Sequence, residues 1–284
     1  MRNKKVILLS GFSRGGTNIV WNILQSHPQI CSARYETGDI LRKRNPIILS
    51  RQVSILSRLG LINRITTRKY LDYKFHRLKM SNMHHPDNKY KTEGVTYSKN
   101  ELINCAICFK SVDFDINHTD LLLNLYPDLY FIALTRNGYA LADGHIRRGS
   151  KAEEFAELYD TIASKMEYYS KAVKNFKLIK FEDVLSQPFK IAEELYEFTN
   201  SSPTKLDKLR LKSKRIVGKE GDHKVSFGKE HRKYWFDKSS IYNLLDPSIN
   251  TKQRKNLSKD DISIFNDKAN SSLRFFGYDI RSII

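Results

Sequence analysis

Hydrophobic residues occur along this chain in two kinds of pattern. In some stretches they form short uninterrupted runs, and in others they recur every three or four residues among polar ones. The runs predict buried strands, and the recurring pattern predicts amphipathic helices. Strands are expected at 6–9, 30–33, 105–109, 129–134 and 178–181, and helices after the first strand, at 119–126, 153–174 and 189–199, and near the end of the chain. This alternation indicates an α/β fold in three layers, with a central parallel β-sheet flanked by helices.

The chain has 284 residues and reads as one domain over 1–284, because neither internal repeats nor low-complexity linkers divide it. A segment at about 41–91 is basic and is expected to be helical, with hydrophobic residues interrupted by arginines. Such a stripe could meet a membrane or an acidic acceptor. Packing against the protein's own core is the more frequent arrangement, and we favour it here.

The first predicted strand breaks at a glycine-rich turn, 11–16, and helical spacing begins at Thr17 and Asn18. A loop of this kind presents several backbone N–H groups to the N-terminal end of a helix dipole. An anion, typically a phosphate, is stabilised at such a place without any other device. The sequence therefore predicts a phosphate-binding loop.

The loop departs from the pattern of nucleoside triphosphate-binding proteins. Gly11 and Gly16 keep the expected spacing, but Thr17 stands where the lysine that reaches the terminal phosphates should be. The fixed cation has moved forward to Arg14, whose planar fork of donors suits an oxyanion. A triphosphate is therefore not the expected occupant.

Two further cations follow predicted strands. Lys110 comes directly after the strand at 105–109, and Arg136 follows the strand at 129–134. In parallel sheets with helical crossovers, ligands bind beyond the carboxyl ends of the strands. Arg14, Lys110 and Arg136 are therefore expected at one edge of the sheet, where they would form a site for a highly negative ligand.

The chain is strongly basic. Lys and Arg total 49 against 31 Asp and Glu, which gives a formal net charge of +18. Such a surplus favours polyanionic partners, among them nucleic acids, acidic membrane surfaces, acidic glycans and multiply charged nucleotides. Nucleic acid is not favoured among these, because the basic residues are spread along the whole chain without a zinc-finger or basic-zipper pattern.

The sequence points to a cytoplasmic protein. No hydrophobic run approaches the length of a membrane span, and the basic N-terminus has no convincing secretory cleavage site. Three cysteines, Cys31, Cys105 and Cys108, suit a reducing compartment. The last two form a C-x-x-C pair inside a strand, without the second pair that zinc would need, so no metal site is expected.

Several of these stretches together resemble the sulfotransferase family whose donor is 3′-phosphoadenosine 5′-phosphosulfate (PAPS). The loop with an early cation and a Thr-Asn pair resembles the family's 5′-phosphosulfate loop. The strand and turn at 131–137 resemble its second signature, and 178–188 resembles its strand with an acidic pair ahead of a helix. The segment at 218–224 resembles its glycine loop, and Phe276-Gly277-Tyr278 resembles a common family ending. These stretches occur in the family's order over nearly the whole chain.

The resemblance implies roles for individual residues and no metal. The 5′-phosphosulfate would be held by Arg14, Gly15, Gly16, Thr17 and Asn18, and the 3′-phosphate by Arg136. Lys110 would neutralise charge on the bridging or transferring oxygens. The loop that closes over the nucleotide would contribute Gly218, Lys219, Gly221 and Lys224.

Two positions depart from the family pattern. The usual serine eight positions after the 3′-phosphate arginine is Gly144, and Asn137, Lys219 or His223 could replace it. The basic histidine of the cytosolic small-molecule members is replaced by Val112. Glu36 is our candidate for the base, because members acting on protein tyrosines or glycans place a glutamate after the second strand. His118 is the alternative, since a histidine titrates near neutrality.

The expected function is transfer of a sulfuryl group from PAPS to a hydroxyl or amine of a small-molecule, glycan or lipid acceptor. One alternative is a nucleotide kinase or NTPase on the same fold. Another is a basic protein that binds nucleic acid or a membrane surface and has no enzymatic activity, since a fold alone does not determine function.

Overall fold

The fold is organised around one parallel sheet. The computed structural model describes residues 5–32, 36–43, 64–83, 99–201, 206–217, 223–230 and 232–278. Within these residues five strands pair in the order β2-β3-β1-β4-β5, and all neighbours are parallel. The strands are β1 (Val6–Gly11), β2 (Ile30–Ser32), β3 (Ala106–Val112), β4 (Tyr130–Thr135) and β5 (Phe176–Lys180). All five predicted strands are present, which confirms the expected α/β class.

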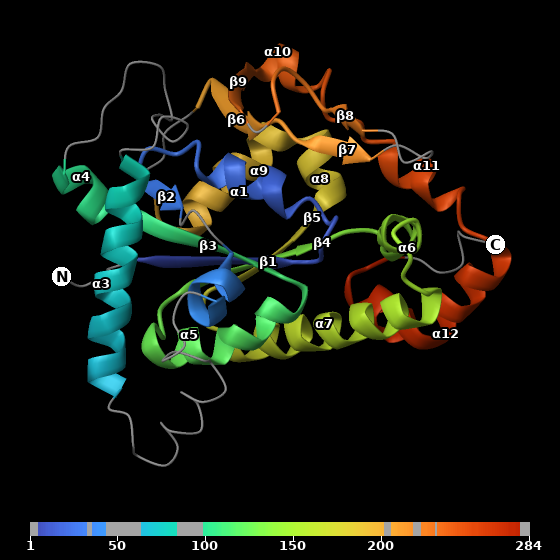
Figure 1. Cartoon of the computed structure of the whole chain (residues 1–284), viewed down its shortest axis with the longest axis horizontal. Helices are drawn as coiled ribbons and strands as arrows, with labels where there is room; N and C mark the ends of the chain where they lie inside the picture. The colour runs from blue at the N-terminus through green and yellow to red at the C-terminus, as the bar shows by residue number, and fades with distance from the viewer. Residues whose placement is uncertain are drawn as a thin grey trace.

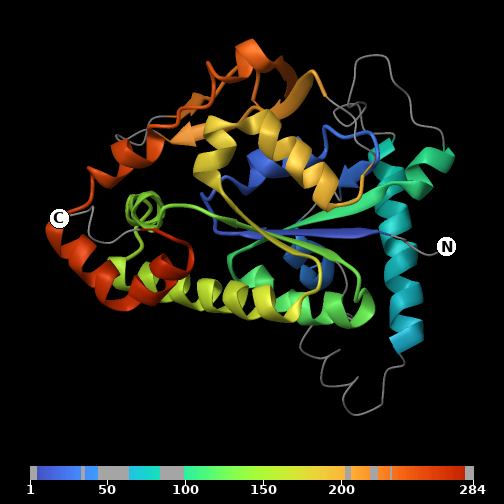
Figure 2. The same ribbon diagram turned by 180° about the vertical axis from the view of Figure 1, so that it is seen from behind.

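Helices cover both faces of the sheet, and Figures 1 and 2 show the three layers from opposite sides. One face carries α1 (Thr17–Leu24), α8 (Phe181–Ser186) and α9 (Pro188–Phe198). The other carries α5 (Thr119–Leu125), α6 (Gly138–Ile146), α7 (Ala152–Ala172) and α12 (Lys259–Phe275). Short α8 was not expected from the sequence, where Phe181 was predicted as the end of a strand.

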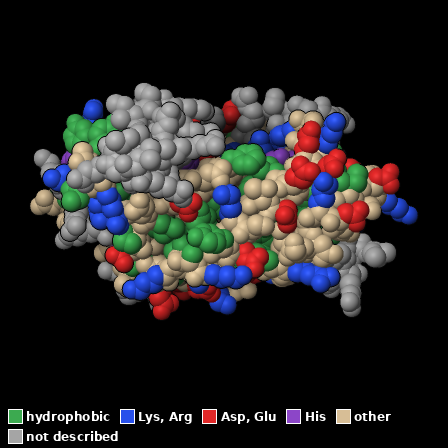
Figure 3. All heavy atoms as spheres, turned by 90° about the horizontal axis from the view of Figure 1, so that it is seen from below, with side chains coloured by type: hydrophobic (Ala, Val, Ile, Leu, Met, Phe, Trp, Pro, Cys, Tyr) green, Lys and Arg blue, Asp and Glu red, His purple; other side chains and the backbone are tan. Residues whose placement is uncertain are grey.

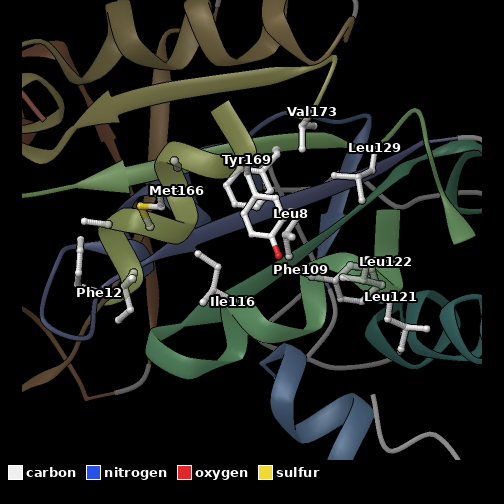
Figure 4. Close-up of a cluster of buried hydrophobic side chains, with 14 of the residues drawn as sticks. Leu8, Phe12, Phe109, Ile116, Leu121, Leu122, Leu129, Met166, Tyr169 and Val173 are labelled. Atoms are coloured by element: carbon white, nitrogen blue, oxygen red, sulfur yellow. The ribbon is translucent and has the colours of Figure 1, made fainter. Parts of the chain in front are cut away.

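Alternate residues of the central strands enter two separate cores. Leu8 of β1 and Phe109 of β3 belong to the core under α5 and α7, while Leu9 and Cys108 belong to the core under α1 and α9. This alternation is expected of strands that are buried on both faces. Figure 4 shows the first core, in which Leu8 and Phe109 meet side chains such as Met166 and Tyr169 of α7.

Part of the predicted basic segment is helical. Helix α3 (Arg64–Met83) contacts β2, α4 (Lys99–Asn104) and α5, and buries Leu71 and Phe75 in the core. A short π-helix, η1 (Asp39–Lys43), precedes it, and a 3₁₀-helix, η4 (Asp113–His118), follows β3. The hydrophobic stripe predicted around 47–62 lies outside the described residues.

The C-terminal third adds two small antiparallel pairs that the sequence did not reveal. Strand β6 (Lys208–Lys212) pairs with β9 (Lys233–Asp237), and β7 (Arg215–Val217) pairs with β8 (His223–Val225). Helices α10 (Lys238–Ile241) and α11 (Ile249–Arg254) follow. The basic composition of β6 hid its strand character, although Leu209 and Leu211 are buried against the α1 layer.

The surface seen from below Figure 1 mixes both signs of charge. Figure 3 shows Lys and Arg side chains interspersed with Asp and Glu over this face. Among the residues coloured by type on that side, positive and negative side chains therefore occur together. Across the described helices, none combines the length and the hydrophobicity that crossing a membrane would require.

Candidate active site

The predicted phosphate loop lies between β1 and α1. The backbone turns through two left-handed residues, Arg14 with φ 62° and Gly16 with φ 88°, and α1 begins directly afterwards. Gly15 N–H donates to Phe12 O over 3.0 Å and closes the turn. A non-glycine residue in the left-handed region is uncommon and marks a backbone that its surroundings hold in place.

Two glycines of the loop are required by close packing. A Cβ on Gly11 would come within 2.7 Å of Thr17 Cγ2, and one on Gly16 would run into the ring of Phe181. Gly16 also has the positive φ that glycine adopts most readily. The glycines that suggested an anion loop therefore also let α1 and α8 approach the end of β1.

Lys110 reaches the same loop from the neighbouring strand. It is paired in register with Leu9, so its side chain projects from the face that carries α1. Its Nζ donates to Asn18 Oδ1 over 2.8 Å and lies 2.6 Å from Glu36 Oε1. The Lys110 side chain is buried, whereas the Glu36 side chain is 42% exposed. The ammonium of this ion pair is therefore enclosed by protein, and the carboxylate is accessible to solvent. Three predicted site residues thus meet.

A cavity of about 520 Å³ opens beside this ion pair, and we call it the carboxylate cavity. It contains four acidic side chains, Glu36, Asp39, Asp113 and Asp115, against two basic ones, Arg14 and Lys110. Its remaining lining residues are Ser13, Thr17, Asn18, Val112 and Phe114.

A second cavity, of about 430 Å³, also borders the loop, and we call it the arginine cavity. One carboxylate, that of Asp246, lines it. Six basic side chains also line it, namely Arg14, Arg136, Arg147, Arg148, Lys212 and Lys214. Hydrophobic side chains complete much of its wall, namely Ile19, Phe181, Leu185, Leu211, Phe227, Leu244, Leu245 and Ile249. Arg14 and Asn18 line both cavities.

Arg136 lies in the wall of the arginine cavity but makes several internal contacts. Its Nε donates to Asn250 Oδ1 over 2.8 Å, its Nη1 to Arg14 O over 2.6 Å, and its Nη2 to Gln253 Oε1. The guanidinium also lies over the ring of Phe181. Burial lowers the pKa of Arg136 to about 10, although the nearby carboxylate of Glu182 opposes this shift. The sequence placed this arginine at the site but did not indicate that it joins the loop to α11.

The acidic residue after β5 ties together parts of the chain that are distant in sequence. Glu182 Oε1 accepts from Asn137 N–H over 2.9 Å and from Asn250 Nδ2, and its Oε2 accepts from Tyr278 Oη–H over 2.9 Å. Lys180 lies over the Tyr278 ring and donates to Gly277 O. Two stretches that carried the resemblance, 178–188 and the terminal Phe-Gly-Tyr, therefore meet behind Arg136.

The sequence did not single out His145 of α6. Its Nε2 lies 2.9 Å from the Ser13 hydroxyl, and the ring stacks on Phe155. Ser13 N–H donates to Asp113 Oδ1 over 2.7 Å, so the tip of the loop is held from both sides. Burial lowers the pKa of His145 below its ordinary value. The sequence gave no signal for this contact, because Ser13 and His145 are 132 positions apart and come together only when β1 and β4 pair in the sheet.

The remaining residues predicted for the site differ in whether they line a cavity. Gly144 lines the arginine cavity, whereas the Asn137 side chain caps α6 by accepting from Tyr139 N–H and Ala140 N–H. His118 is buried at the end of η4 and is not among the residues that line either cavity. Lys224 is exposed on β8, away from both linings. Gly218, Lys219 and Gly221 lie outside the described residues, and His223 is the first residue of β8.

Lys214 is a second residue of the site that the sequence pattern did not indicate. It follows β6 and lines the arginine cavity together with Arg14. Burial, reinforced by the positive charges of Lys110, Arg14 and Lys212, lowers the pKa of Lys214 to about 7. In the sequence it is one of many lysines in a basic stretch, and only the folded chain distinguishes it.

Comparisons with known proteins bear on the family and the fold. The family model described as "Sulfotransferase family" matches residues 7–202, which is more than half of the chain. The sulfotransferase domain from the Synechococcus PCC 7002 olefin synthase has a similar structure, with TM-score 0.53 and 14% identity over 99% of this chain and 97% of that one. The sulfotransferase domain from the curacin biosynthetic pathway gives TM-score 0.50 and 11% identity, over 98% and 99%.

At these identities the two structures support the fold alone, and a search of curated proteins found no matching sequence. The family match extends from β1 through α9 and so includes the phosphate loop, the Lys110 strand and the Arg136 strand. The chain belongs to the sulfotransferase family.

Proposed function

We propose that this protein transfers a sulfuryl group from PAPS to a hydroxyl or amine group of its acceptor. One observation carries the proposal: Arg14 and Asn18 line both the arginine cavity and the carboxylate cavity. A donor in one cavity and an acceptor in the other would meet at these two side chains.

The arginine cavity is suited to the donor. Its six basic side chains match a nucleotide with a phosphosulfate at one end and a phosphate on the ribose, because guanidinium groups bind such oxyanions through paired hydrogen bonds. Phe227, which is only partly buried in this wall, offers hydrophobic surface for a purine. In this proposal the loop amides of Gly15–Asn18 and Arg14 hold the phosphosulfate, while Arg136 contributes positive charge near the 3′-phosphate.

The carboxylate cavity is suited to the acceptor. Its lining carries more acidic than basic groups, which favours a neutral hydroxyl or an amine over an anion beside Glu36. This leaves an acceptor such as a glycan, a lipid or a smaller molecule, with any acidic part directed away from the four carboxylates. Glu36 is favoured over His118 as the base, because Glu36 lines the cavity and His118 does not.

The proposed chemistry needs one proton transfer and one displacement. Glu36 accepts the proton of the acceptor group as the acceptor oxygen or nitrogen bonds to sulfur. The bond between sulfur and the bridging oxygen breaks, and that oxygen leaves on the 5′-phosphate of 3′,5′-adenosine bisphosphate. Lys110, which contacts both Glu36 and Asn18, neutralises charge that develops on the leaving and transferring oxygens. Positioning and electrostatic stabilisation dominate such reactions by analogy with phosphoryl transfer.

The competing functions predict different ligands. A kinase or NTPase would need a lysine at position 17 to reach the terminal phosphates, and this chain has the uncharged Thr17 there. A thermal-shift measurement should therefore give stabilisation by 3′,5′-adenosine bisphosphate and little by ATP with magnesium. Magnesium-dependent stabilisation by ATP would contradict the proposal. Binding of RNA with a steep salt dependence and no effect of the bisphosphate would favour a binding protein.

The acceptor can be identified with radiolabelled donor and pools of glycans, lipids and small alcohols or amines. We expect label transfer to a neutral hydroxyl or amine. Transfer only to a group flanked by carboxylates or sulfates would contradict the assignment of the carboxylate cavity to the acceptor.

A further inference from the structure

Lys214 is held in place by its backbone rather than by its charge. Its N–H donates to Ser226 Oγ over 3.0 Å, and its carbonyl accepts from Ser226 N–H over 2.9 Å. The neighbouring Ser213 Oγ donates to Phe227 O. These bonds join the end of β6 to the end of β8 and fix the point from which the lysine enters the arginine cavity.

The groups that face Lys214 are mostly positive. Arg14 of the loop, Lys110 of β3 and Lys212 of β6 all act against its charged form, and Glu36 is the carboxylate that favours it. Arg136, Arg147 and Arg148 line the same cavity, and so does Asp246, whose carboxylate pairs with Lys252 over 2.6 Å. Within the described parts of the chain, the Lys214 ammonium forms no ion pair. A partly buried ammonium among cations is short of negative charge, which an anionic ligand would supply.

We propose that Lys214 binds the phosphosulfate end of the donor and that its amine takes up a proton from solvent when the donor binds. This rests on the proposed function, since it assumes a PAPS-like ligand in the arginine cavity. The lysine is then largely neutral above neutral pH in the empty protein and a full cation beside the bound anion. It completes the positive surroundings that Arg14 and Lys110 begin.

Isothermal titration calorimetry with 3′,5′-adenosine bisphosphate tests the proposal without any acceptor. At pH 8 the phosphates of the free ligand are deprotonated, whereas a lysine with its pKa near 7 is mostly neutral. Titrations in buffers of different ionisation enthalpy should reveal net proton uptake by the wild-type protein. Lys214→Met should abolish most of this uptake and weaken binding about 10- to 100-fold, as expected for a lost hydrogen bond to a charged group.

Two further variants separate the role of Lys214 from general effects of charge or folding. Lys214→Arg keeps a cation that stays protonated, so it should retain binding and lose the uptake. Lys208→Met is the matched control, because Lys208 is exposed on β6, the strand that precedes Lys214, and does not line the cavity. It should leave both affinity and uptake unchanged.

The outcomes are distinguishable. If the bisphosphate does not bind the wild-type protein, the proposed function itself is wrong. If it binds the wild type and Lys214→Met with the same affinity and the same proton uptake, the function stands and the role of Lys214 is overturned. A purely structural lysine would change the melting temperature of the empty protein but not the number of protons taken up.

Discussion

The guanidinium of Arg136 donates a hydrogen bond to the carbonyl oxygen of Arg14 over 2.6 Å. Arg14 adopts a left-handed backbone conformation, which costs a non-glycine residue about 1–3 kcal/mol and persists only where the surrounding structure holds it. The contact therefore lets one arginine support the backbone of the other. In the proposed function, Arg136 would therefore act on the donor through the shape of the loop as well as through its charge.

Replacing Arg136 should affect both folding and binding. Arg136→Met leaves the acceptor atoms of Asn250, Gln253 and Arg14 without their donor, which costs about 1–3 kcal/mol for each acceptor that stays buried. We expect a lower free energy of unfolding in urea and weaker binding of 3′,5′-adenosine bisphosphate. Arg136→Lys should recover only part of both, because an ammonium cannot reproduce the planar fork. Exposed Arg274 supplies the control, and equal stability of Arg136→Met and Arg274→Met would contradict this role.

Glu36→Gln should separate catalysis from donor binding. The substitution preserves shape but removes the carboxylate that pairs with Lys110. We expect the transfer rate to fall about 10²- to 10⁴-fold, as for loss of a positioned base, while bisphosphate binding is maintained. Asp39→Asn, which removes another carboxylate from the same cavity, should have a much smaller effect on rate. Unchanged transfer by Glu36→Gln would exclude this residue as the base.

Gly144→Ser should be tolerated and should strengthen donor binding. A Cβ at this position would lie 3.7 Å from the nearest atoms of Arg14, an ordinary van der Waals contact, so the serine has room in the wall of the arginine cavity. One added hydrogen bond is worth about 0.5–1.5 kcal/mol, or roughly 2- to 10-fold in affinity for the bisphosphate.

Calorimetry would measure this affinity for Gly144→Ser. By contrast, Gly16→Ser should unfold at a lower temperature because the new side chain would meet Phe181. If Gly144→Ser were as destabilising as Gly16→Ser, the cavity would not extend to Gly144 as described.

Tyr278→Phe should destabilise the protein although Tyr278 lies near the end of the chain. Its hydroxyl donates to Glu182, which in turn accepts from Asn137 N–H and Asn250. Burial and the adjacent Glu182 carboxylate raise the pKa of Tyr278 above its ordinary value, so the hydroxyl remains a donor. We expect a loss of about 1–3 kcal/mol in urea unfolding. Tyr242→Phe, at an exposed tyrosine, should be neutral, and a neutral Tyr278→Phe would contradict the proposed network.

Lys214 also predicts a pH dependence of stability. Its pKa falls from 10.5 to about 7 on folding, so between these values the unfolded chain binds more protons than the folded one. Deprotonation of Lys214 therefore raises the free energy of unfolding as the pH rises from about 7 to about 10.5. Below pH 7 the lysine is charged in both states, and its burial lowers the free energy of unfolding by the full amount.

Lys214→Met should accordingly be more stable than the wild type at pH 7, by on the order of 1–2 kcal/mol after allowance for solvent screening. The difference should vanish above pH 10.5. Urea unfolding of the empty proteins at several pH values would measure it, and a difference that does not change with pH would contradict the shifted pKa.

The sequence alone determined the layered α/β fold and the location of the glycine-rich loop between β1 and α1. Hydrophobic runs, helical spacing and the glycines between Gly11 and Gly16 are local features, and each acts on the backbone within a few residues. The parallel arrangement then placed Arg14, Lys110 and Arg136 at one sheet edge, because the carboxyl ends of parallel strands lie together. Strand β6 escaped prediction because its composition is basic and its partner, β9, is distant in sequence.

Only the tertiary structure decided which cation contacts which partner. Arg136 meets Asn250, Glu182 meets Tyr278, and Lys214 approaches Lys110, although each pair is separated by more than ninety positions in the chain. Side-chain contacts at such separations depend on how helices and strands pack, and burial and neighbouring charges then set the properties of each group. For this reason the basic stretch around 205–215 looked uniform in sequence, while in the folded protein Lys212 and Lys214 line the proposed donor site and burial sets Lys214 apart.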